Sequence, residues 1–171
     1  MTLPLTTIKA ALQDWLTDAT GLPVIWQFQN VPEPNTPFIS VNPVANIKRI
    51  GVDDERIPND TTGLGSMAAH RELMCSVNAM GAGALAALSA ALDKLETPTL
   101  YDGWFYARGL AARTGELRNL TGMKNSRFEQ RAQIDVTITC VNTDQTDDAG
   151  YFDHLEYSAS TPIIIPTTTI P

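Results

Sequence analysis

The sequence predicts an α+β fold in which two amphipathic helices pack on one face of a mainly antiparallel sheet. Apolar residues recur at helical spacing near the N-terminus and again between residues 82 and 95. Two other segments, Arg71–Met80 and Gln130–Val141, alternate apolar and polar residues as half-buried strands do. We expect one domain over residues 1–150, with long loops, and an extended C-terminal arm over residues 151–171.

The first element is an amphipathic helix over residues 7–19. Thr6 or Thr7 is a candidate N-cap, and Gly21 is a typical C-terminal stop. Its predicted buried face comprises Ile8, Ala11, Leu12, Trp15 and Leu16. A short strand over residues 24–28 should follow, and the prolines after it favour an extended connector.

A second strand is expected to begin at Phe38 and to reach Ile50. Pro43 lies within it and cannot donate to a β-ladder, so we expect an edge position or a bulge there. The segment from Gly51 to Ala69 is rich in charged residues, glycine and proline without apolar periodicity. It is therefore predicted to be a long loop.

The alternating segment 71–80 predicts a strand whose buried side chains are Leu73, Cys75, Val77 and Ala79. Glycines at positions 81 and 83 end this strand, and a second helix over residues 82–95 should follow. The apolar stripe of this helix is predicted to be Leu85, Leu88, Leu92 and Leu95. Thr97-Pro98 should end the helix.

The remaining elements are a strand, a loop and a second alternating strand. Aromatic residues over 99–107 favour a strand next to a turn at Asp102-Gly103. Residues 113–127 are polar and predict a loop, with a short strand around Leu117. The alternating strand 130–141 should then bury one face and expose the other.

The composition limits the classes of function. Net charge is −7, and the sequence has no basic cluster longer than Lys48-Arg49, so specific nucleic-acid binding is not expected. Charged residues make up 18%, below the ~25% of an average domain, which favours a subunit with many protein contacts over a soluble monomer. No secretory signal or apolar run of ~20 residues is present, so we expect a cytoplasmic protein without membrane contact.

A search for catalytic, metal and cofactor sites nominates no residue. His70 and His154 are the imidazole bases, and neither lies near a nucleophile motif. The acidic runs 53–55 and 147–148 lack calcium-loop spacing, and the glycines at 81 and 83 lack the remainder of a phosphate-binding loop. Cys75 and Cys140 are expected to be buried and reduced. We therefore predict a protein that is not an enzyme and uses no cofactor.

The order of elements resembles the phage neck-terminator and tail-terminator families. The similarity rests on the end of the first helix with Thr20–Trp26, the proline-rich step into Phe38–Val41, the strand leading into helix 82–95, and Phe128–Val136. It spans about residues 6 to 141. The C-terminal Ile/Pro/Thr segment departs from the family pattern and leaves open whether the protein is the terminator or an adjacent collar protein.

The resemblance implies a structural virion protein that is assembled in the bacterial cytoplasm. Such a protein forms a ring, six-fold or else twelve-fold, which terminates the tail tube and joins it to the head connector. Its partners would be copies of itself, a tail tube or sheath protein and the head-tail connector, with DNA only as passing cargo. Two alternatives stay open: a head-side connector, collar or minor capsid protein, and a small enzyme or ligand-binding domain of unknown chemistry.

Subunit contacts are expected in the charged loop, on the polar face of the last strand and in the C-terminal arm. The arm contains isoleucines that are costly to leave in water, while its prolines prevent local folding. The predicted interface residues are Asp53, Asp54, Arg56, Glu129, Arg131, Ile163, Ile164, Ile165 and Ile170.

Overall fold

In a computed structural model, the described residues form a seven-stranded sheet, a separate two-stranded hairpin and a layer of helices. The structure describes residues 3–28, 32, 34–51, 55–58, 65–124 and 126–146. The elements in chain order are α1 (Leu5–Thr20), β1 (Val24–Trp26), β2 (Phe38–Arg49), β3 (Glu55–Pro58), β4 (Gly65–Met80), α2 (Ala84–Leu95), α3 (Pro98–Trp104), the 3-10 turn η1 (Tyr106–Arg108), β5 (Leu110–Thr114), β6 (Arg118–Asn119), β7 (Gly122–Lys124), β8 (Arg127–Glu129) and β9 (Arg131–Thr146).

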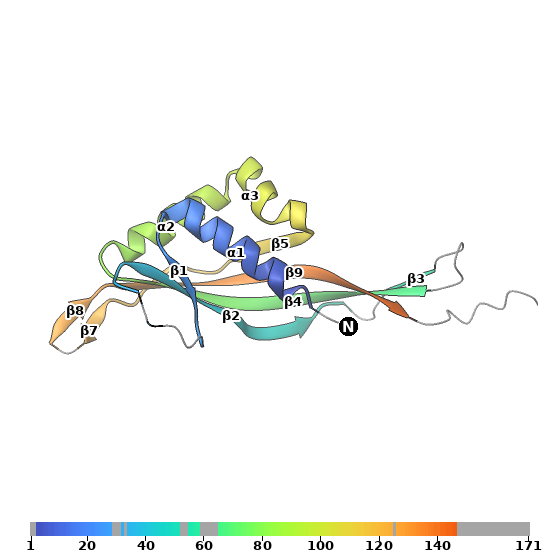
Figure 1. The fold of residues 1–171 in the computed structure, drawn as a ribbon, viewed down its shortest axis with the longest axis horizontal. Coiled ribbons are helices and arrows are strands. Elements are labelled where there is room, and N and C mark those ends of the chain that lie inside the picture. Colours follow the sequence, from blue (N-terminus) through green and yellow to red (C-terminus); the bar gives the residue numbers. More distant parts are fainter. Residues whose placement is uncertain are drawn as a thin grey trace, which may run out of the picture.

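The predicted fold class is confirmed. The main sheet has the strand order β1-β2-β4-β9-β5, with β3 also paired to β4 and β6 to β9. All of these pairings are antiparallel except that of β1 with β2. Figure 1 shows α1, α2 and α3 on the same face of the sheet. Among the described residues, no helix has the length and apolar character to cross a membrane.

The long antiparallel pair of β4 and β9 forms the centre of the sheet. The pairing is continuous from Gly65 opposite Thr146 to Met80 opposite Arg131. The predicted inward residues of β4 are buried, and so are the apolar residues of β9 from Ala132 to Cys140. The alternation in the sequence therefore identified both strands and the face that each one buries.

Helix α1 covers this core through the residues that its periodicity predicted. Trp15 is fully buried, and its Nε1 donates to the carbonyl of Ala91 in α2 at 3.0 Å. Gly21 ends the helix in the left-handed conformation, with φ of 69° and its N–H bonded to the carbonyl of Thr17. The predicted threonine N-caps are wrong, because the helix starts at Leu5 and position 4 provides no side-chain cap.

Strand β2 confirms the predicted irregularity at Pro43. Its register against β4 shifts between Asn42 and Asn46, so the strand bulges where the proline cannot donate a hydrogen bond. The prediction of a continuous loop over 51–69 is wrong: β3 and the first residues of β4 are paired strands. Their sequences, ERIP and GSM, show no sustained alternation of apolar and polar residues, so tertiary pairing specifies these strands and apolar periodicity does not.

The predicted strand over residues 99–107 is also wrong. Pro98 stands at the first turn of α3, a position that suits its fixed φ and its missing N–H. The helix places Trp104 against α1, where its Nε1 donates to the carboxylate of Asp18 at 3.1 Å. Phe105, just after the helix, packs edge-on against Trp15 with ring centroids 6.0 Å apart. Tyr101, Trp104 and Phe105, at helical spacing, therefore face the core, whereas Tyr106 is exposed.

The predicted loop over 113–127 contains several short strands. β5 and β6 pair with β9, and β6 agrees with the short strand expected near Leu117. β7 and β8 form a small hairpin with Met123 opposite Phe128. Figure 1 shows this hairpin projecting from one end of the molecule, while β3 with the ends of β4 and β9 extends from the other.

Candidate functional site

The predicted interface residues separate into two ends of the sheet. Arg56 belongs to β3, whose partner is the first part of β4. Glu129 ends β8 and Arg131 begins β9, which places both at the opposite end, beside the small hairpin. The sequence analysis placed Glu129 on the polar face of the last strand, but that strand begins at Arg131 and Glu129 belongs to β8. The predicted interface residues outside the described part of the chain are Asp53, Asp54, Ile163, Ile164, Ile165 and Ile170.

A groove of about 360 Å³ lies at the base of the hairpin. Arg131 lines it, and its Nη2 donates to the buried Asn78 at 2.8 Å. The Nε of this arginine is buried and finds no acceptor among the described residues. The full lining is Pro34, Thr36, Phe38, Met80, Leu120, Gly122, Met123, Glu129 and Arg131.

The junction at Gly81 fixes the geometry of this end. Its φ is 96°, and a Cβ at this position would lie 2.8 Å from the Cβ of Thr36. Its N–H also bonds to the carbonyl of Gln130 at 2.9 Å. Only glycine fits this close approach. The chain segments at Thr36, Gly81 and Gln130 therefore pack tightly against one another beside the groove.

The helix-free face of β4 and β9 carries a row of polar contacts. Gln133 donates to Ser76 at 2.8 Å, and Arg118 lies 3.5 Å from Asp135. These are cross-strand neighbours of the kind predicted for the polar face of the last strand. Such partly exposed pairs contribute little to stability, typically below ~1 kcal/mol.

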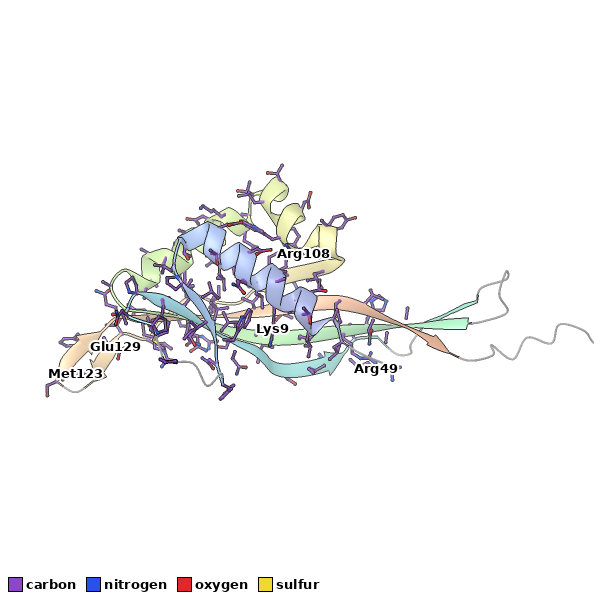
Figure 2. The ribbon with its side chains drawn as sticks, viewed as in Figure 1. Lys9, Arg49, Arg108, Met123 and Glu129 are labelled. Atoms are coloured by element: carbon purple, nitrogen blue, oxygen red, sulfur yellow. The ribbon has the colours of Figure 1, made fainter. Side chains whose placement is uncertain are left out.

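The hairpin itself exposes two large apolar side chains. Met123 is 72% exposed and Phe128 is 80% exposed, and the two are register partners. Figure 2 shows Met123 at the tip and Glu129 toward the base of the hairpin. Sequence reasoning missed this feature because the segment was interpreted as a polar loop. Two apolar residues flanking a short polar turn were the available signal.

A second concavity lies where β5 begins. It is an open trough of about 470 Å³, and it was not predicted. β5 pairs with β9 only as far as Cys140, whereas β9 continues to Thr146 with β4 as its partner on the other side. Within the described residues, one edge of β9 is thus open beside the trough. The trough is lined by Tyr106, Gly109, Leu110, Ala111, Thr139, Cys140 and Val141.

Comparison with known protein families decides what kind of protein carries these surfaces. The sequence profile of the phage neck terminator proteins matches residues 6–163, which is most of the chain. The chain belongs to this family. No curated protein matches it significantly.

Family membership makes this neck terminator a structural protein of the bacteriophage neck and a component of the virion. It also implies contacts with other head and tail proteins. The resemblance of the helix and strand order to terminator proteins is thereby confirmed. Surfaces that would be unexplained on an isolated domain, such as the exposed hairpin tip and the open strand edge, are what a structural subunit needs.

The thiols of the neck terminator are suited to packing. Neither Cys75 nor Cys140 forms a disulfide, and both are buried. Burial raises the pKa of Cys75 to about 12, so the thiol stays protonated and poorly nucleophilic near neutral pH. Burial also raises the pKa of Cys140, although the positive charge of Arg71 partly opposes this. Among the described residues, no group of His, Cys, Asp or Glu has the arrangement of a metal site.

Proposed function

We propose that this neck terminator forms a closed ring, six-fold or else twelve-fold, that ends the tail tube and joins the tail to the head connector. The observation that carries the proposal is the pair of projections at opposite ends of one sheet, which among the described residues leave exposed apolar side chains at one end and an unpaired edge of β9 at the other. A subunit with different surfaces at its two ends can associate head to tail, and such contacts form a ring where the rotation between neighbours closes.

The interface residues nominated from the sequence fit this arrangement. Arg56 lies on the projection formed by β3 and β4, and Glu129 with Arg131 lies at the other end. Neighbouring subunits would bring such opposite ends together. The net charge of −7 per subunit favours a lumen to which DNA does not adhere, so that DNA passes only as cargo.

We further propose that residues 162–171 act as an extended arm that docks on another protein of the neck. Its isoleucines would each leave ~1.5–3 kcal/mol of burial unrealised in water, and its prolines oppose local folding. Extended segments of this kind commonly add to an open strand edge, where backbone hydrogen bonds supply affinity. The tail tube protein, the head connector and a second copy of the chain are the candidate partners.

Loss of the gene separates this function from its alternatives. Without a tail terminator, we expect filled heads, tail tubes of irregular length and few joined particles, all restored by the wild-type gene. Loss of a head-side connector would instead give heads that leak DNA beside tails of normal length. Joined particles with tails of normal length in the absence of the protein would contradict both roles.

A further inference from the structure

We propose that the exposed apolar pair Met123 and Phe128, which lies one register pair before the turn of the β7–β8 hairpin and is called the tip below, docks in the trough beside β5 of a neighbouring copy. The inference rests on the proposed ring and names the contact that builds it. Each subunit would present one projecting tip and one receiving trough.

The tip has the properties of a binding element. Its two side chains are 72% and 80% exposed, and they face each other across the hairpin, so they form one continuous apolar knob. Exposed apolar groups of this size gain substantial free energy on burial. The base of the hairpin is also anchored at Gly81, whose N–H donates to the carbonyl of Gln130, the residue after β8.

The trough has the complementary properties. Its lining is mainly apolar, and the open trough of about 470 Å³ has room for apolar side chains. Val141 on its rim is 47% exposed. Beyond Cys140 the edge of β9 is open among the described residues, so an incoming hairpin strand would also find backbone hydrogen-bonding groups.

Tip and trough of the same subunit cannot meet. β9 leads from Arg131, beside the hairpin, to Cys140, beside the trough, and at ~3.3 Å per residue this distance is about 30 Å. Figure 1 shows the hairpin and the start of β5 well separated along the long axis. The contact must therefore form between copies, and a head-to-tail series of such contacts builds the proposed ring where the rotation between neighbours closes.

Charge favours contact between the hairpin and a different part of the neighbouring copy. Residues 118–131 contain four basic and one acidic residue, in a chain whose net charge is −7, so the remainder of the chain is acidic. Two hairpins facing each other would bring like charges together.

Engineered disulfides test the contact directly. In the full chain, the double variant Met123→Cys with Val141→Cys should give, under mild oxidation, a ladder of covalent multimers ending at the size of the ring. Each single variant should give no ladder, because a chain with one exposed thiol links to only one other. Leu85→Cys with Val141→Cys is the matched control, since Leu85 is 43% exposed but lies on α2; it should give no ladder.

A second pair of variants measures the energetic role of the tip. Met123→Ser with Phe128→Ser should leave the melting temperature unchanged, because both side chains are exposed, while raising the concentration required for assembly at least about tenfold. Leu85→Ser should leave assembly unchanged.

The outcomes separate the inference from the function on which it rests. A ring that forms without the disulfide ladder, and that tolerates the serine variants, overturns the docking while the ring stands. Dimers from Met123→Cys alone would show tips meeting each other, which also overturns it. If removal of residues 161–171 leaves the trough unoccupied and the tip variants do not, the trough binds the C-terminal arm instead. A protein that is monomeric at every concentration and in particles overturns both proposals.

Discussion

Replacement of Leu88 by alanine tests how the helix layer is attached to the sheet. Leu88 is 1% exposed and belongs to the core formed by α1, α2 and the sheet, whereas Leu85, one turn earlier on α2, is 43% exposed. The leucine periodicity of the sequence predicted both as core residues. The structure separates them, so the two substitutions form a matched pair on one helix.

The expected magnitudes differ severalfold. Leu88→Ala removes buried methyl groups and leaves a cavity, which costs about 2–5 kcal/mol. Leu85→Ala should cost less than about 1 kcal/mol, because much of the side chain is already in water and alanine is the better helix former. For a chain of this length, a loss of 3 kcal/mol lowers the melting temperature by about 6–12 °C.

Urea unfolding followed by far-UV circular dichroism measures both losses, and equal slopes show that the two variants unfold like the wild type. Ile134→Ala, on β9 and 1% exposed, should match Leu88→Ala. Losses below 1 kcal/mol at both Leu88 and Ile134, or an equal loss at Leu85, would refute the assigned core.

Three further predictions follow from single contacts and segments. Tyr101→Phe should cost about 1–2 kcal/mol, because the Tyr101 hydroxyl accepts from the N–H of Ala112 at 2.8 Å, while Tyr106→Phe at an exposed site should cost nothing measurable by the same unfolding assay. The free energy of unfolding should fall as pH rises from 9 toward 12, because the unfolded chain loses the Cys75 thiol proton at lower pH than the folded chain does. The loss through Cys75 should be on the order of 4 kcal/mol. Cys75→Ala should flatten this decline relative to the wild type. Deletion of residues 161–171 should leave the melting temperature nearly unchanged but reduce incorporation into necks, and unimpaired incorporation would show that the arm has no structural role.

The sequence was sufficient where one face of an element is consistently buried. Trp15 in α1, Cys75 in β4 and Ile134 in β9 lie on regular apolar periods, and each is buried as predicted. Gly21 and Pro43 were also interpreted correctly, because their backbone properties restrict what the chain can do around them.

The sequence was insufficient where tertiary contacts decide the structure. β3 and the start of β4 have no apolar period and are specified by pairing with their neighbours in the sheet. Tyr101 and Trp104 have high strand propensity, yet Pro98 begins a helix that packs them over the core. Of the predicted interface residues, Glu129 and Arg131 lie together in the groove. The hairpin tip and the trough could not be predicted, because β7, β8 and β5 were not recognised as strands.

Reconstruction of the neck in intact particles tests the central claim most directly. The account predicts a ring of identical copies of this α+β fold, six-fold or else twelve-fold, seated between the tail tube and the head connector, with the hairpin tip of each copy in contact with the next. A single copy of the fold, or a location away from the junction of head and tail, would contradict it.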